Sequence, residues 1–220
     1  MNLPSPSRLI FIGDSITDAG RDQTSGEPSP WSPNFGLGSG YVSLVWAWLA
    51  AAYPQKPIRV FNKGTSGNNA RDLDARWETD VTGLDPDVLC VMIGINDVWR
   101  QFDVPLRPDH QVAPEEYRAI LDRLLGRTRP QIQQLYLASP YYIEPNREEP
   151  MRKRMDEYGQ IVKDLAEAHD ATFIDVQAAF DAVLAHVHPT SLGWDHIHPG
   201  MHGHMIIARA FLKAFGCPVP

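Results

Sequence analysis

Three side chains with the chemistry for nucleophilic catalysis stand at opposite ends of the chain. Ser15 closes the tripeptide Gly-Asp-Ser at positions 13–15, and Asp195 and His198 stand three residues apart near the carboxyl end. A serine hydroxyl becomes a good nucleophile when an imidazole takes its proton and a carboxylate fixes the tautomer of that imidazole. The residue types therefore predict acyl transfer, provided that the fold brings the two segments together. Gly-Asp-Ser alone is also common in turns and at helix starts, so this tripeptide does not by itself identify a nucleophile.

Two further segments supply candidate donors for an oxyanion. Residues 62–69 follow an apolar run at 58–61, and residues 94–97, Gly-Ile-Asn-Asp, follow another at 88–93. A tetrahedral intermediate needs N–H groups aimed at its new negative charge, and an unhindered glycine amide or the Asn96 carboxamide can provide them. In the first segment Gly64 and Gly67 are both candidates.

Four blocks in chain order resemble those of the SGNH, or GDSL-type, hydrolases. They are Gly-Asp-Ser at 13–15, the segment around Gly67, Gly-x-Asn-Asp at 94–97 and Asp-x-x-His-Pro at 195–199, and together they span nearly the whole chain. The resemblance implies a serine esterase without a cofactor. It also favours Gly67 over Gly64, because Thr-Ser-Gly-Asn at 65–68 matches the family's second block better.

The same resemblance implies a role for each matching residue. Ser15 is expected to be the nucleophile and, through its amide, an oxyanion donor beside Gly67 and Asn96. His198 is expected to be the general base, and Asp195 the carboxylate that orients it.

Three longer stretches look like intracellular SGNH esterases that remove acetyl groups from xylo-oligosaccharides. They are residues 94–102, 151–158 and 175–181. The substrate implied is an acetylated sugar, and the partner is a small-molecule or oligosaccharide ester. A broader lipase, thioesterase or arylesterase is the alternative, because one scaffold serves many substrates. The Pro-, Asp-, Arg-, Ser- and Gly-rich loops favour a small acyl group over an extended apolar chain.

Composition bounds the remaining choices. The 220 residues, 43% hydrophobic and 21% charged, suit a single domain over 1–220. The formal net charge of -7 argues against binding to nucleic acid, and no apolar run reaches the ~20 residues that a membrane helix needs. Two cysteines and an amino terminus without a signal-peptide pattern predict a cytoplasmic protein. The pattern leaves the number of subunits open, with a homo-oligomer among the possibilities.

Alternating apolar runs and helical periods predict an α/β fold. Strands are expected at 9–12, 58–61, 88–93, 132–138 and 172–176, with helices at 41–53, 71–82, 114–127, 148–169, 177–186 and 202–215. This order predicts a mostly parallel five-stranded sheet in a three-layer α/β/α sandwich. The resemblance implies the flavodoxin-like SGNH version of that sandwich.

Long connections at 21–40, 98–113 and 139–147 are expected to surround the site. Aromatic and polar side chains there suit a sugar ring, so Trp99, Arg100 and Tyr141 are candidate substrate contacts, with Trp194 beside Asp195 as a fourth. The alternative is that the aromatics only pack the loops down, because large rings routinely stabilise by burial.

Two rival classes are weighed against the esterase. Five histidines at 188, 196, 198, 202 and 204, with nearby aspartates, suggest a metal-dependent hydrolase as an alternative. Their spacing matches no recognised ligand signature, so no metal is predicted. His202 and His204 are expected on the outer face of the last helix, and Asp14 and Asp97 as turn acceptors. A non-catalytic sugar-binding protein is the second rival, and an activated serine argues against it.

Overall fold

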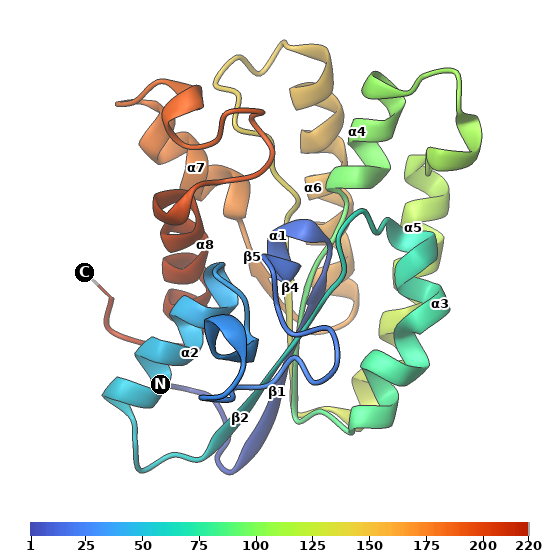
Figure 1. Cartoon of the computed structure of the whole chain (residues 1–220). Helices are drawn as coiled ribbons and strands as arrows, with labels where there is room; N and C mark the ends of the chain where they lie inside the picture. Colours follow the sequence, from blue (N-terminus) through green and yellow to red (C-terminus); the bar gives the residue numbers. More distant parts are fainter. Residues whose placement is uncertain (220) are drawn as a thin grey trace.

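A five-stranded parallel sheet forms the centre of the computed structural model, which describes residues 1–219 apart from the side chain of residue 33. Residue 220, the end of the expected domain, lies outside the described residues. The spatial order is β2-β1-β3-β4-β5, and each neighbouring pair is parallel (Figure 1). The strands are β1 (Ser7–Gly13), β2 (Ile58–Gly64), β3 (Val88–Met92), β4 (Gln134–Ala138) and β5 (Thr172–Ile174).

Helices cover both faces of the sheet, which confirms the three-layer sandwich. On one side α2 and α7 pack against α8, and on the other α3 and α6 pack against α5 (Figure 1). The α-helices are α1 (Ser15–Asp18), α2 (Tyr41–Ala52), α3 (Ala70–Asp80), α4 (Ile95–Asp103), α5 (Pro114–Thr128), α6 (Pro150–Ala168), α7 (Val176–Leu184) and α8 (Met201–Ala214). Short 3-10 turns lie at η1 (Pro33–Gly36), η2 (Thr82–Leu84), η3 (Pro108–His110), η4 (Arg129–Gln131) and η5 (Pro189–Ser191).

Burial on both faces explains why the central strands are continuous apolar runs. All five residues of β3 are buried, and in β1 the stretch from Leu9 to Gly13 is buried as well. A parallel strand covered by helices on each side has no solvent face, so alternation of polar and apolar residues disappears. The run itself, rather than its periodicity, was therefore the correct signal for these strands.

Two of the eight α-helices within residues 1–219 were not predicted, namely the short α1 and the longer α4. The stretch 98–113 was expected to be a long connection, but its first part belongs to α4, which begins at Ile95. The spacing of Ile95, Val98, Trp99 and Phe102 is the i, i+3, i+4, i+7 pattern of an amphipathic helix. This helix therefore has a sequence signal of its own, which overlaps the Gly-x-Asn-Asp motif at 94–97.

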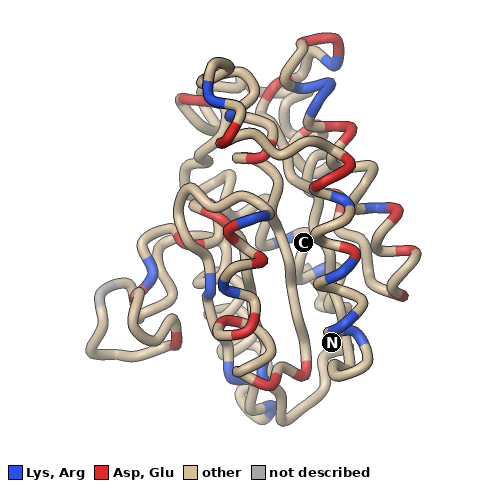
Figure 2. Tube along the Cα trace, turned by 90° about the vertical axis from the view of Figure 1, so that its right-hand side faces the viewer, with Lys and Arg blue, Asp and Glu red and all other residues tan. Residues whose placement is uncertain are grey.

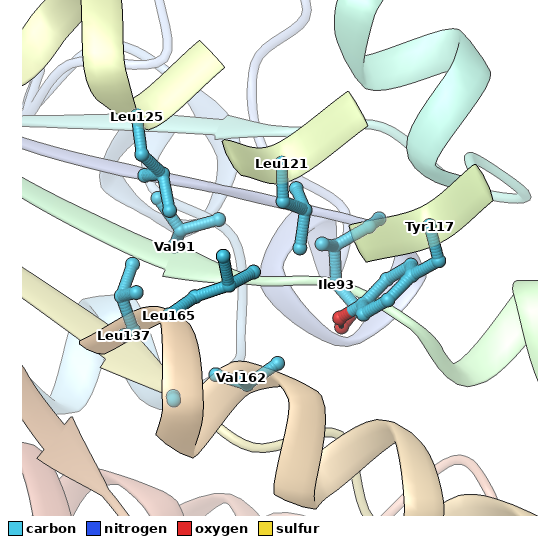
Figure 3. Close-up of a pocket in the computed structure, with 9 residues that line it drawn as sticks. Val91, Ile93, Tyr117, Leu121, Leu125, Leu137, Val162 and Leu165 are labelled. Atoms are coloured by element: carbon cyan, nitrogen blue, oxygen red, sulfur yellow. Dashed lines mark hydrogen bonds between the residues drawn. The ribbon is translucent and has the colours of Figure 1, made fainter. Parts of the chain in front are cut away.

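A small apolar void lies between the sheet and the layer of α5 and α6. Figure 3 shows Val91 and Ile93 facing Leu121 and Leu125 of α5 across this space, with Val162 of α6 below them. Its lining consists almost wholly of apolar side chains, so it has no groups with which to bind a polar substrate. It is a packing defect of the core rather than a candidate site.

The carboxyl ends of β1 and β3 are where the chain can build a site. Strand β1 continues into α1, and β3 is followed by α4, with Gly94 just before the helix. The connection from β1 leads to β2 on one side, whereas β3 lies on the other side of β1. In open α/β sheets such a reversal leaves a crevice beyond the strand ends where ligands bind.

Charges of both signs are distributed over the surface. Figure 2 shows Lys and Arg interleaved with Asp and Glu along the helices that face the viewer, without a continuous basic stripe. Within residues 1–219, no helix has both the length and the apolar character needed to cross a lipid bilayer.

Candidate active site

The turn after β1 presents Ser15 at the first position of α1. Asp14 caps this short helix, because its Oδ1 accepts a hydrogen bond of 2.9 Å from the Ile16 amide. A side chain at Gly13 would place its Cβ 2.3 Å from the Met92 carbonyl oxygen of β3. Glycine is therefore required for the close approach of β1 and β3 that exposes the serine at the strand end.

Ser15 meets the carboxyl-terminal loop in three dimensions. Its Oγ lies 2.9 Å from His198 Nε2, across 183 residues of sequence. The other ring nitrogen, Nδ1, lies 2.6 Å from Asp195 Oδ2. An imidazole held in this way has Nε2 free to accept the serine proton while the carboxylate stabilises the cation that forms.

Backbone hydrogen bonds hold Asp195 and His198 in a fixed relation to each other. Asp195 Oδ1 accepts hydrogen bonds from the amides of Ile197 (3.0 Å) and His198 (2.8 Å). Burial disfavours the charged carboxylate, but the hydrogen bonds from the His198 ring and from these two amides outweigh it, so the pKa of Asp195 lies below its ordinary value. The carboxylate is thus ionised wherever the imidazole can act as a base.

Tyr141 contacts the loop at 195–198 from the protein core. Its hydroxyl donates to the Ile197 carbonyl at 3.1 Å, and its ring stacks on Phe180 at 4.3 Å between centroids. The side chain is 0% exposed, so it cannot touch a substrate. The prediction of Tyr141 as a substrate contact is wrong, because the strand end carries it into the core rather than onto the rim.

Only one of the two candidate glycines has a free amide. The Gly64 amide donates to Asn62 Oδ1 at 2.9 Å, and a Cβ at Gly64 would lie 2.1 Å from the Asp18 amide nitrogen. Gly67 has a φ of +83°, and a Cβ there would meet nothing within 4 Å. Among residues 1–219 its amide has no acceptor, as an oxyanion donor requires.

Asn96 contacts the residue that follows this glycine. Its Nδ2 donates to the Asn68 carbonyl at 2.9 Å, and its Oδ1 accepts from Arg100 Nη2 at 3.2 Å. These two contacts determine which end of the carboxamide is nitrogen. One N–H of Nδ2 remains for a ligand at the same edge as Ser15.

Arg100 and Trp99 lie one turn further along α4. The Trp99 ring meets the His198 ring edge-on at 6.1 Å between centroids, and the Arg100 guanidinium stacks 4.2 Å over Trp99. Arg100 also pairs with Asp103. Trp99 therefore borders the imidazole directly, whereas much of Arg100 is engaged in orienting its neighbours. Trp194, 83% exposed, projects from the loop that carries Asp195.

Two aspartates beside the site are fully buried. Burial raises the pKa of Asp14 to about 7, although the hydrogen bond from the Ile16 amide and the nearby His198 and Arg76 side chains act to lower it. Burial likewise raises the pKa of Asp97 to about 7, and the nearby Asp14 adds to the shift. Asp97 Oδ1 accepts from the Ala70 amide at 2.9 Å, so it ties α4 to the start of α3. Its Oδ2 is buried without a hydrogen-bond partner in the described structure.

The histidines do not form a cluster around a metal position. Across the described part of the chain, no three His, Cys, Asp or Glu side chains are arranged to hold a metal ion. His204 was expected on an outer face, but it is buried with 9% exposure, and its Nδ1 accepts from the Tyr41 amide at 3.3 Å. Burial, with a smaller effect of His198, lowers the pKa of His204 to about 4, so it stays neutral at the start of α2. Cys90 and Cys217 are both buried and unpaired.

Two charged residues after Ser15 contact the turn that leads to Gly67, and neither had been assigned a role. Asp18 Oδ2 accepts from the Ser66 amide (3.1 Å) and from its hydroxyl (2.9 Å), and Arg21 Nε donates to the Gly64 carbonyl at 2.6 Å. Their only sequence signal is proximity to the nucleophile motif.

The sequence is similar to those of known hydrolases. The model of the GDSL-like lipase/acylhydrolase family matches residues 11–206. The chain belongs to this family. It is 50% identical to the acetylxylan esterase of Geobacillus stearothermophilus over 217 residues, which are 98% of this chain and 97% of that protein.

Solved structures agree with that placement. The crystal structure of Axe2, an acetylxylan esterase from the same organism, is 49% identical with a TM-score of 0.95 and covers 99% of this chain and 98% of that one. LAE5, an alpha/beta hydrolase from the metagenome of Lake Arreo, Spain, is 52% identical with a TM-score of 0.96 over 100% of both chains. Other solved forms of Axe2 are catalytic mutants in which a serine, a histidine or an aspartate is replaced by alanine. The SGNH hydrolase fold expected from the four blocks is thereby confirmed.

Proposed function

We propose that the protein is a serine esterase that removes O-acetyl groups from carbohydrate, with acetylated xylo-oligosaccharides as its substrates. The observation that carries the proposal is the contact chain from Ser15 Oγ through the His198 ring to Asp195 Oδ2. The chain is 50% identical to an acetylxylan esterase over 98% of its length, and this similarity supports acetyl as the acyl group and xylose as the sugar. A broader lipase, thioesterase or arylesterase is the second candidate.

In the proposed mechanism Ser15 attacks the acetyl carbonyl while its proton passes to His198 Nε2. The resulting oxyanion accepts hydrogen bonds from the amides of Ser15 and Gly67 and from Asn96 Nδ2. His198 then protonates the departing sugar alcohol, which leaves an acetyl group on Ser15 Oγ. Water deprotonated by the same ring releases acetate, so each proton is returned and no cofactor takes part.

The surroundings of the base support a sugar substrate. Trp99 offers an apolar ring beside His198, and Trp194, which precedes Asp195 in the chain, offers another that is exposed. A pyranose presents C–H faces that stack on such rings, whereas a long acyl chain needs an extended apolar groove. Trp99, Arg100 and Trp194 remain the proposed substrate contacts.

The test compares Ser15→Ala with the wild type on acetylated xylo-oligosaccharides. We expect kcat to fall by about 10⁴-fold or more with thermal unfolding unchanged. An organophosphonate should label the wild type once, at Ser15, and leave the variant unlabelled. Activity within tenfold of the wild type in Ser15→Ala would exclude the assigned nucleophile.

A substrate panel separates the two candidate functions. Acetylated xylo-oligosaccharides, medium-chain aryl esters and acyl thioesters are compared by kcat/KM on the same enzyme. Preference for the first supports the carbohydrate assignment. Preference for aryl esters or thioesters would support the assignment as a serine hydrolase and reject the assignment of a carbohydrate substrate.

The setting of the enzyme is part of the proposal. We infer one catalytic domain, because the residues of the contact chain come from both ends of the sequence. Two buried, unpaired cysteines support a reducing compartment, the cytoplasm. Self-association is proposed from the exposed Trp31, because aromatic side chains are enriched at protein interfaces, and sedimentation of the purified protein would test it.

A further inference from the structure

The turn that carries Gly67 has little backbone structure of its own. Here residues 65–69 are called the Gly67 turn. One hydrogen bond lies within it, from the Asn68 amide to the Thr65 carbonyl at 3.2 Å, and the Thr65 amide joins it to the Gly13 carbonyl at 3.0 Å. The amide of Gly67 must nevertheless keep a defined direction if it is to meet an oxyanion. Side chains from other elements have to supply that constraint.

Arg76 reaches this turn from the middle of α3. Its side chain is only 16% exposed, and Nε donates to Asn68 Oδ1 at 2.6 Å. Nη2 donates to the Gly13 carbonyl and Nη1 to the Lys63 carbonyl, each at 2.7 Å. One guanidinium therefore joins the residue two positions before Ser15, the end of β2 and the Gly67 turn.

The chemistry of these contacts requires arginine. A guanidinium carries five N–H donors in a rigid plane, so it can hold three acceptors in a fixed relation. The lysine ammonium is a single point on a flexible stem and cannot reach the three acceptors together. The ion pair with Asp80, 2.8 Å from Nη1, adds charge compensation at the end of α3.

Asn68 is held from two sides. Arg76 binds its side chain, and Asn96 Nδ2 binds its carbonyl at 2.9 Å. A displacement of Asn68 would therefore move the neighbouring Gly67 amide and the Asn96 carboxamide at the same time. Both are donors in the proposed mechanism, and Arg76 itself touches neither the substrate nor the reacting atoms.

We propose that Arg76 is a positioning residue that sets the Gly67 turn against the Ser15 turn, so that the amides of both turns and Asn96 point at one oxyanion. The inference rests on the proposed function, because it assumes that those three groups are the oxyanion donors. It assigns to α3 a part in catalysis beyond covering the sheet.

The experiment compares Arg76→Lys with Asp80→Asn. The first keeps the positive charge and loses the planar fork, whereas the second removes the ion pair and leaves the contacts with Gly13, Lys63 and Asn68. We expect Arg76→Lys to lower kcat on an aryl acetate by about 10- to 100-fold, as a displaced oxyanion donor does, with KM within about twofold. Asp80→Asn should stay within about twofold of the wild type, and titration of Ser15 with an organophosphonate corrects for the folded fraction.

A second readout separates alignment from general damage. An ester and its thiono analogue differ in the atom that takes the negative charge, and sulfur accepts hydrogen bonds weakly. The wild-type preference for the ester over the thiono ester, as a ratio of kcat/KM, should fall in Arg76→Lys. A loss of folded protein alone lowers both rates and leaves that ratio unchanged.

Each outcome decides the proposal. Folded Arg76→Lys with the wild-type kcat and ester-to-thiono ratio would overturn it. If Arg76→Lys does not fold, Asn68→Ala removes only the Nε acceptor, and a wild-type ratio in that variant would overturn the proposal equally. An active Ser15→Ala would instead refute the proposed function, and that result is independent of the Arg76 ratio.

Discussion

Replacing Asp195 by asparagine tests the proposed role of this carboxylate, which is to orient His198. In the native structure Oδ2 lies 2.6 Å from His198 Nδ1, while Oδ1 accepts from the amides of Ile197 and His198. Asparagine can keep only one oxygen. Its orientation decides whether His198 keeps the tautomer that accepts the Ser15 proton.

The two backbone amides determine that orientation. If the amide oxygen of asparagine keeps both backbone hydrogen bonds, its NH₂ faces His198 Nδ1. The flipped orientation would aim NH₂ at two N–H donors and lose two bonds worth about 1 kcal/mol each. The first orientation is therefore preferred, and it forces Nδ1 to accept. The ring proton then moves to Nε2, which donates to Ser15 Oγ instead of accepting its proton.

We expect Asp195→Asn to lower kcat by about 10⁴-fold, the loss known for a wrong tautomer in a serine triad, which corresponds to about 5.4 kcal/mol of transition-state stabilisation. The free energy of unfolding should change by less than about 1 kcal/mol. Asp195→Ala is the matched control, because it also removes both backbone bonds and should cost about 2 kcal/mol more in stability. Steady-state hydrolysis of an aryl acetate and urea unfolding measure the two effects. A variant Asp195→Asn that keeps more than a tenth of the wild-type kcat would refute the tautomer argument.

The remaining predictions concern stability. Burial raises the pKa of Asp97 to about 7 in the folded protein, whereas its pKa is about 3.9 in the unfolded chain. Between these pH values the folded state binds a proton that the unfolded state has lost. The stability of the wild type therefore falls as the pH rises from about 4 to about 7. Asp97→Asn does not titrate, so urea unfolding should show its stability relative to the wild type rising by on the order of 2 kcal/mol from pH 5 to pH 8; an equal difference at both pH values would contradict this. Gly64→Ala should destabilise far more than Gly67→Ala, because its Cβ would lie 2.1 Å from the Asp18 amide nitrogen, whereas Gly67 has open space and only a strained φ of +83°, costing about 1 kcal/mol. Equal melting temperatures for the two glycine variants would show that the contact at Gly64 is relieved by backbone movement.

Local patterns determined the fold class and the residue types of the site. The apolar runs before Gly13 and Gly94 predicted buried parallel strands, because helices on both faces of a sheet remove polar residues from its strands. The spacing of Asp195 and His198 is also local, and a loop of that length can bring a carboxylate to a ring nitrogen without help from distant residues. These features lie within a few positions of each other, which is the range over which a sequence pattern carries structural information.

Only the tertiary structure decided which groups are available at the site. Gly64 is excluded as a donor because Asn62 occupies its amide, and Tyr141 is excluded as a substrate contact because Phe180 and the 195–198 loop bury it. The guanidinium of Arg76 joins three segments that no periodicity links. Burial and hydrogen-bond occupancy depend on contacts between residues far apart in the chain. They are settled when the sheet closes and its covering helices pack, and not by the order of the amino acids near each residue.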